Sequence, residues 1–181
     1  MNHKPNKALL IIDVINHFQF DHGTDLLEQS LAFLPNLMQL KQKAKQQQIP
    51  IIYINDHYNL WQADFNKIIS HCTTVQTKAF LSQIKPDDND YFLIKPKHSA
   101  FYGTALNTLL FHLGVDHLIL TGIAGNICVL FTANDAYMRN YKLNCPKDCI
   151  ASVNKQDNEY ALTMMQNVLQ ADLTESYNLL L

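Results

Sequence analysis

Three residues far apart in the sequence carry side chains that could together cleave an amide or an ester: Asp13, Lys95 and Cys128. Cys128 falls in the first turn of a helix predicted over 127–140, where unpaired N–H groups and the helix dipole favour the nucleophilic thiolate. A carboxylate can accept a thiol proton, and an ammonium can keep the carboxylate ionised. Backbone N–H groups of the preceding turn could stabilise an oxyanion. These groups suffice for acyl transfer through a thioester.

Each of the three residues also has a purely structural explanation. Most free cysteines are small buried hydrophobic residues, and Cys128 could be one of them. Asp13 could be a loop residue, and Lys95 could be a strand-end charge that reaches solvent. Catalysis is favoured only if the fold brings the three residues together.

Short apolar runs predict the strands that would position these residues. The continuously apolar run 8–12 ends at Asp13 and is typical of a strand buried on both faces of a parallel sheet. The other predicted strands are 49–55, 91–95, 115–120 and, broken by Pro146, 142–150. The tail 171–181 could add a further strand.

Helical periodicity fills the intervals between these strands. Thr24 is a candidate N-cap for a helix that runs to residue 48, and Pro35 is expected to interrupt it. The other predicted helices are 103–113, closed by Gly114, then 127–140 and 155–170, while 67–81 could form a short helix or a strand fragment. This alternation predicts an α/β fold: a three-layer, doubly wound, mostly parallel sheet of about six strands with helices on both faces, in a single domain 1–181.

In an open α/β sheet the carboxyl ends of the strands share one edge, where ligands bind. Asp13, Lys95 and the turn before Cys128 each lie at the carboxyl end of a predicted strand, so we expect them to meet there. Loops at or just beyond this edge supply aromatic candidates for the wall of a substrate pocket: Phe18, Tyr58, Trp61 and Phe101. Asn55 and Asn126 could add polar contacts to the pocket. Some of the aromatic residues could instead pack against helices or a second subunit.

The composition limits the classes of partner. The chain has 181 residues, 48% of them hydrophobic and 17% charged, with a net charge of −2, which is typical of a globular protein that binds neither nucleic acid nor anionic membranes. Four scattered cysteines do not make a disulfide framework, and Cys145 and Cys149 are expected to be buried. We therefore expect a soluble, cytoplasmic protein. Apolar residues left over in 133–141 favour a homo-oligomer, a dimer or a tetramer.

Three segments in the same order, spanning nearly the whole chain, resemble the isochorismatase-like cysteine hydrolase superfamily, which includes nicotinamidases, N-carbamoylsarcosine amidases and isochorismatases. They read LLIIDVINHF, LIKPKHSAFYGT and LILTGIAGNICVLFTANDAYMRNY. The resemblance implies a catalytic triad of Asp13, Lys95 and Cys128. It also implies a non-proline cis peptide bond between Ile123 and Ala124, which would direct the N–H groups of Ala124 and Cys128 at the substrate oxygen.

The sequence departs from two branches of this superfamily. Metal-binding nicotinamidases carry Asp-x-His after the second strand, whereas here Asp56-His57-Tyr58 places Tyr58 at the histidine position. His71 alone cannot complete a zinc or iron site, which needs three or more ligands, so we expect no catalytic metal and no other cofactor. Isochorismatases proper lack the nucleophilic cysteine, so Cys128 argues against that activity.

The resulting prediction is a cysteine hydrolase that cleaves a non-peptide C–N bond in a small amide, or secondarily an ester. Two alternatives stay open: a catalytically silent binding or assembly protein of the same fold, and a redox-sensing thiol protein.

Overall fold

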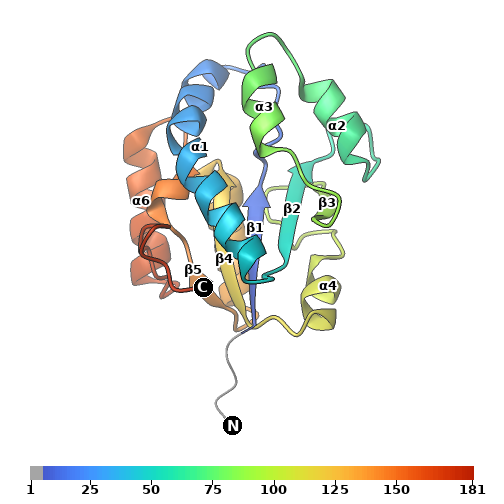
Figure 1. Cartoon of the computed structure of the whole chain (residues 1–181). Coiled ribbons are helices and arrows are strands. Elements are labelled where there is room, and N and C mark those ends of the chain that lie inside the picture. The colour runs from blue at the N-terminus through green and yellow to red at the C-terminus, as the bar shows by residue number, and fades with distance from the viewer. Residues whose placement is uncertain (1–5) are drawn as a thin grey trace.

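A parallel sheet forms the middle layer of this computed structural model, which describes residues 6–181 (Figure 1). Its strands are β1 (Lys7–Ile12), β2 (Ile51–Asp56), β3 (Tyr91–Lys95), β4 (His117–Ile123), β5 (Lys142–Asn144) and β6 (Ile150–Ala151). They lie in the order β3-β2-β1-β4-β5, β6 also pairs with β4, and these pairings are parallel. The predicted doubly wound α/β fold is confirmed.

Helices cover both faces of the sheet. One core includes residues of α1 (Gly23–Gln46), α2 (Phe65–Cys72) and α3 (Lys78–Ile84). The other includes residues of α4 (Leu106–His112), α5 (Leu130–Tyr137) and α6 (Lys155–Asn167). None of the helices described for residues 6–181 has the length and apolar character that crossing a bilayer requires.

Strand β1 explains why the sequence shows a continuous apolar run rather than an alternating one. Leu9 and Ile11 belong to the core beneath α1, whereas Ala8, Leu10 and Ile12 belong to the opposite core, and all five have 0% exposure. A strand buried on both faces has no position for a polar side chain.

The start of α1 differs from the prediction. The helix begins at Gly23, after His22, whose φ of 63° is left-handed and whose side chain makes no capping hydrogen bond, so the prediction of Thr24 as N-cap is wrong. A Cβ at Gly23 would lie 2.0 Å from the carbonyl oxygen of Phe18. The preceding loop therefore approaches so closely that only glycine fits.

Pro35 lies inside α1 without ending it, so the predicted interruption is wrong. Its ring is exposed, while Phe33, Leu34 and Leu37 are buried in the core beneath the helix. An internal proline costs about 3 kcal/mol. Burial of three large apolar side chains, at about 1.5–3 kcal/mol each, outweighs that cost.

Three other segments resolve what the sequence left open. Residues 67–81 fall largely within the two helices α2 and α3. The predicted strand 142–150 is broken, as expected, because a 3₁₀ turn (Lys147–Cys149) follows Pro146 and separates β5 from β6. In the described part of the chain the tail adds no further strand but only a single bridge, between Asn144 and Asp172.

The strand order reverses at β1. From β1 the chain moves through β2 to β3 on one side, and then returns to β4 on the other side of β1. In a doubly wound sheet this reversal opens a crevice at the carboxyl ends of the two central strands. Asp13 directly follows β1, and the turn that carries Cys128 directly follows β4.

Candidate active site

The carboxylate of Asp13 is fixed at the carboxyl end of β1, with only 6% of the residue exposed. Its φ of 53° is left-handed, a conformation that aspartate tolerates better than most residues. Oδ1 accepts a hydrogen bond of 2.8 Å from the N–H of Asp56, and Oδ2 lies 2.7 Å from Nζ of Lys95. The backbone of β2 and a side chain of β3 thus hold the two oxygens.

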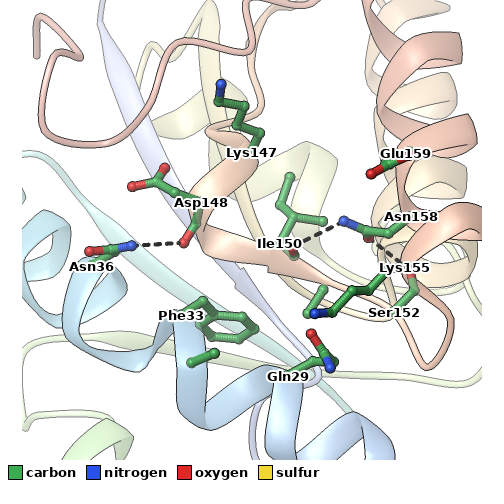
Figure 2. A pocket seen from close by; sticks show the side chains of 12 residues that line it. Gln29, Phe33, Asn36, Lys147, Asp148, Ile150, Ser152, Lys155, Asn158 and Glu159 are labelled. Atoms are coloured by element: carbon green, nitrogen blue, oxygen red, sulfur yellow. Dashed lines mark hydrogen bonds between the residues drawn. The ribbon is translucent and has the colours of Figure 1, made fainter.

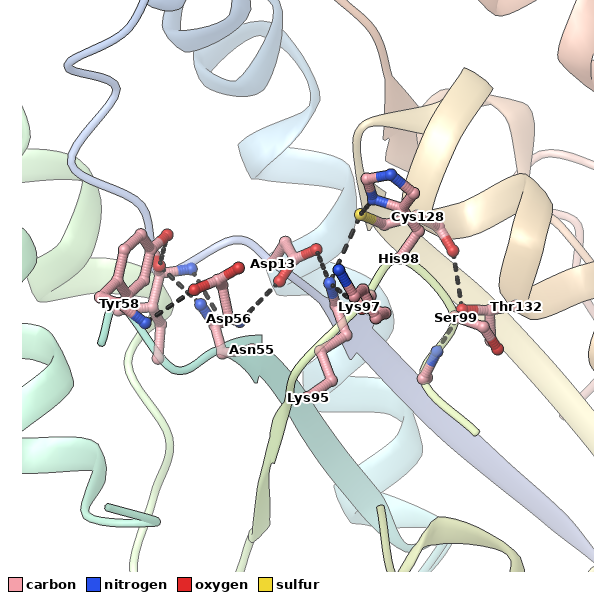
Figure 3. Close-up of polar contacts among 12 residues, drawn as sticks. Asp13, Asn55, Asp56, Tyr58, Lys95, Lys97, His98, Ser99, Cys128 and Thr132 are labelled. Atoms are coloured by element: carbon pink, nitrogen blue, oxygen red, sulfur yellow. Dashed lines mark hydrogen bonds and ion pairs between the residues drawn. The ribbon is translucent and has the colours of Figure 1, made fainter. Parts of the chain in front are cut away.

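Lys95 is the last residue of β3 and is 2% exposed. Its Nζ contacts Oδ2 of Asp13, Sγ of Cys128 at 3.4 Å and the carbonyl oxygen of Lys97 at 3.1 Å, as Figure 3 shows. These contacts match the three donors of an ammonium. Burial lowers the pKa of Lys95, but the Asp13 carboxylate and the Cys128 sulfur raise it, and the net shift is upward, so the amine stays charged.

Cys128 lies in a π-helical turn, Gly125–Val129, that joins β4 to α5. Gly122, near the end of β4, packs closely against β1: a Cβ there would lie 2.1 Å from the carbonyl oxygen of Ile12. The φ of Gly122 is 113°. The peptide bond between Ile123 and Ala124 is cis. Only glycine tolerates both the close approach to Ile12 and the positive φ at position 122, so Gly122 is the residue that permits the elbow.

The protonation state of Cys128 differs from the prediction. Burial, followed by the nearby Asp13 carboxylate, raises the pKa of the thiol to about 12, and the favourable effect of Lys95 does not compensate. The expectation that the helix start favours a resting thiolate is therefore wrong, because desolvation and a like charge dominate. Burial also raises the pKa of Asp13, although Lys95 lowers it, which makes this carboxylate a stronger base than an exposed one.

A second set of hydrogen bonds ties the segment after Lys95 to the helix after Cys128. The hydroxyl of Ser99 donates to the carboxylate of Asp135, and the N–H of Ala100 donates to Oγ1 of Thr132 at 3.0 Å. Thr132 in turn donates to the carbonyl oxygen of Cys128 at 2.7 Å. Sequence reasoning missed Thr132, although a threonine four residues after a nucleophile is placed to bond back to it.

His98 lies on the same segment, at the exposed side of the triad. Its Nδ1 is 4.0 Å from Sγ of Cys128, and its ring packs against Phe131 with 5.6 Å between centroids. The sulfur therefore has an ammonium on its buried side and an imidazole on its exposed side (Figure 3).

Comparison with known proteins agrees with this arrangement. A family model described as the isochorismatase domain matches residues 7–176. The chain belongs to the isochorismatase family. Members of this family are hydrolases, and the predicted relationship to the isochorismatase-like superfamily is confirmed.

Among relatives of this isochorismatase-family chain, YaaI of Bacillus subtilis (strain 168), itself described as uncharacterized, is 60% identical over 171 residues, which cover 94% of each protein. The nicotinamidase SaPncA of Staphylococcus aureus superposes with a TM-score of 0.74 at 26% identity, over 94% of this chain and 99% of that one. The N-carbamoylsarcosine amidase of Thermoplasma acidophilum has a TM-score of 0.72 at 24% identity, over 96% and 98%, and supports the fold alone.

Three of the predicted pocket residues instead build the frame of the isochorismatase-family site. Phe18 is 6% exposed and packs edge-on against Phe80. Asn55 is fully buried, and its side chain bonds both the N–H and the carbonyl oxygen of Ile15. Phe101 is also buried. Its ring faces Arg139 and Tyr141, beyond the far end of α5.

The other three candidates lie on half-buried or exposed segments. The hydroxyl of Tyr58 donates to the carbonyl oxygen of Ile15 at 2.9 Å. Trp61 is 65% exposed and stacks on His57 with 3.9 Å between ring centroids. Asn126 is half-buried beside the nucleophile turn, and its N–H donates to Oγ of Ser152 at 3.0 Å. Trp61 and Asn126 therefore stay predictions as pocket residues.

The donors near Asp56 do not fit the metal site of the metal-binding nicotinamidases in this family. Tyr58 directs its hydroxyl to Ile15, and its N–H donates to Oδ1 of Asp56 at 2.6 Å. The ring of His57 stacks on Trp61. Within residues 6–181, no three His, Cys, Asp or Glu side chains converge as metal ligands.

Proposed function

We propose that this isochorismatase-family protein is a cysteine hydrolase that cleaves the C–N bond of a small, non-peptide amide, with an ester as the secondary substrate class. The observation that supports it most directly is the Nζ of Lys95, which contacts both Oδ2 of Asp13 and Sγ of Cys128 in one buried cluster. The similarity to SaPncA, named a nicotinamidase, supports an amide as the substrate class.

In the proposed reaction Asp13 accepts the proton of Cys128 as the sulfur attacks the substrate carbonyl carbon. The oxyanion is bound by the N–H groups of Ala124 and Cys128. Asp13 then gives the proton to the leaving nitrogen, the C–N bond breaks, and ammonia or an amine leaves a thioester behind. Water attacks the thioester, Asp13 takes a proton from it, the C–S bond breaks, and the thiolate regains that proton.

The charges of the cluster suit this order of events. The resting thiol is neutral because its pKa is raised to about 12, so the cluster holds one ion pair and not two adjacent anions. Attack on the carbonyl moves negative charge from sulfur to oxygen as the proton passes to Asp13. Lys95 stays charged throughout and stabilises whichever group carries the negative charge.

A screen of small amides tests the proposal, with nicotinamide, carbamoyl and ureido compounds as substrates and ammonia release as the readout. For the amide that is hydrolysed, Cys128→Ala and Cys128→Ser should each lower kcat/KM by about 10³-fold or more while the melting temperature stays near that of the wild type. Cys149→Ala is the matched control, since Cys149 is also a buried thiol with a pKa of about 12 but lies outside the cluster. Full activity in Cys128→Ala refutes the mechanism.

The two alternatives have different signatures. A silent binding or assembly protein hydrolyses none of the amides, although its triad geometry is intact. A redox-sensing thiol is disfavoured by the raised pKa of Cys128, because sensor cysteines have low pKa values and react as thiolates.

We further propose that the protein works in the cytoplasm on a free small molecule, without nucleic acid or membrane, as a homodimer or homotetramer. Support for self-association comes from three apolar side chains on or near α5 and α6: Phe131 is 52% exposed, Met138 71% and Met164 51%. Such exposed apolar side chains are typical of surfaces that become covered on association. The molar mass in solution, measured by light scattering, tests this.

A further inference from the structure

A chain of hydrogen bonds links the nucleophile turn to β6 and α6. The N–H of Asn126 donates to Oγ of Ser152 at 3.0 Å, and the Ser152 hydroxyl donates to Oδ1 of Asn158 at 2.8 Å. The amide nitrogen of Asn158 then donates to the carbonyl oxygen of Ile150 at 3.3 Å (Figure 2). Both groups of the Asn158 side chain and both functions of the Ser152 hydroxyl are therefore used.

These hydrogen bonds supply a cap that the nucleophile turn itself lacks. Ala124, the residue before the π-helical turn, makes no side-chain capping bond. The N–H groups of Ile127 and Val129 both bond to the carbonyl oxygen of Ala124, at 3.0 and 3.2 Å. The first N–H groups of a helical segment need acceptors from outside it. Ser152, the residue directly after β6 and 26 positions further along the sequence, provides one for Asn126.

Contact between the turn and α6 is tight as well as polar. A Cβ at Gly125 would lie 2.2 Å from Oδ1 of Asn158 and 3.1 Å from Oγ of Ser152. Ser152 is only 2% exposed. Because the turn backbone packs directly on these two side chains, their position determines where the peptide planes of the turn lie.

We propose that Ser152, oriented by Asn158, is a positioning residue for the oxyanion-binding turn; this inference rests on the proposed hydrolase function. By holding the Asn126 peptide, Ser152 keeps the N–H groups of Ala124 and Cys128 aimed at the substrate oxygen. It acts through the backbone, because its hydroxyl is bonded to Asn126 and Asn158. The role belongs to stabilisation of the tetrahedral intermediate and not to activation of the thiol.

The surroundings of Ser152 dictate the choice of variants. Ser152 and Asn158 line a cavity of about 340 Å³ between α1 and α6, together with Gln29, Asn36 and Lys155 (Figure 2). Removal of the hydroxyl in Ser152→Ala leaves room for a water from this cavity to accept the Asn126 bond. Ser152→Thr and Ser152→Val form a better pair, because threonine and valine have the same shape and differ only in the hydroxyl.

The test compares this pair on an amide that the wild type hydrolyses. Ser152→Val should have a kcat about 10–100-fold below that of Ser152→Thr, with similar KM, because a misaligned oxyanion donor weakens binding of the intermediate more than binding of the substrate. Alkylation of Cys128 by iodoacetamide needs no oxyanion hole and should proceed equally fast in both variants. Hydrogen exchange at the Asn126 amide should be faster in Ser152→Val. Gln29→Ala, in the same cavity, should match the wild type.

Several results would overturn the inference. Equal kcat in the threonine and valine variants would show that the hydroxyl does not position the turn. A parallel loss of kcat and alkylation rate would show an effect on the thiol or on the whole fold. If the wild type hydrolyses no amide, the hydrolase proposal fails, but the role of Ser152 is still tested by hydrogen exchange. Equal exchange rates of the Asn126 amide in the threonine and valine variants would refute that role. If Ser152→Val does not fold, Asn158→Ala serves as the second variant, with the same expected loss of kcat at unchanged alkylation.

Discussion

Nζ of Lys95 lies 3.4 Å from Sγ of Cys128, although β3 and β4 are separated in the sheet by β2 and β1. The lysine covers only part of this gap, and the turn after β4 brings the sulfur to its amine, while the whole residue stays 2% exposed. Asp13, at the end of β1, lies in its path and forms the ion pair. The three groups are therefore one electrostatic unit, and a change in any one alters the free energy of the other two.

The Asp13–Lys95 ion pair should show strong coupling in stability. Asp13→Asn and Lys95→Met should each lower the free energy of unfolding by about 3–5 kcal/mol, because each leaves one charge buried without its partner. The double variant should lose less than the sum of the two, since neither charge remains. Urea unfolding of the four proteins measures this cycle, and additive losses would show that the pair is not coupled.

Alkylation of Cys128 should follow the raised pKa of the thiol. The ordinary pKa of a cysteine thiol is about 8.5, whereas the pKa of Cys128 is raised to about 12. The rate of alkylation by iodoacetamide should therefore keep rising with pH beyond about 8.5, without a plateau near neutral pH. Asp13→Asn should speed alkylation at neutral pH while it abolishes turnover, since the carboxylate disfavours the thiolate. Cys128→Ser supplies the background rate of the other cysteines. A plateau at neutral pH would mean a resting thiolate.

Thr132 should matter through its hydroxyl alone. Thr132→Val keeps the shape of the side chain but leaves the N–H of Ala100, a fully buried residue, without its acceptor. An unpaired buried donor costs about 1–3 kcal/mol, so the melting temperature should fall. The segment after Lys95 should also loosen and lower kcat/KM. Thr132→Ser, which keeps the hydroxyl, is the matched control, and equal stability of the two variants would contradict this assignment.

The turn before β3 should make stability depend on acid pH. Hydrogen bonds from Lys45 and Lys41 lower the pKa of Asp87, so the folded state holds its proton less tightly than the unfolded state. The stabilisation is therefore complete above the pKa of an ordinary carboxyl group, about 4, and it is lost as the pH falls through the lower pKa of Asp87 in the folded state. Asp87→Asn should flatten the melting-temperature profile in this acid range, and Asp88→Asn, outside the ion pairs that Lys41 and Lys45 form with Asp87, is the control. Parallel profiles for wild type and Asp87→Asn would refute this.

Periodicity predicted the strands well because β1 is buried on both faces, so that 8–12 had to be continuously apolar. The proline rule failed at Pro35, because the burial of Phe33, Leu34 and Leu37 in the core outweighs the local cost of proline inside a helix. Asn55 shows the same limit for the site. Nothing in its neighbourhood in the sequence indicates that its side chain bonds the backbone of Ile15, in the loop after β1.

The sequence by itself determined which chemistry is available: a carboxylate just after β1, an amine at the end of β3, a thiol in the turn after β4, and a glycine where the elbow passes close to β1. Only the tertiary structure decided how these groups act on one another. The pKa of Cys128 depends on desolvation and on the charges of Asp13, just after β1, and Lys95 of β3, and the Asn126 peptide is bonded to Ser152, just after β6. Such effects arise from distances of a few ångströms between segments remote in sequence, and local patterns carry no information about them.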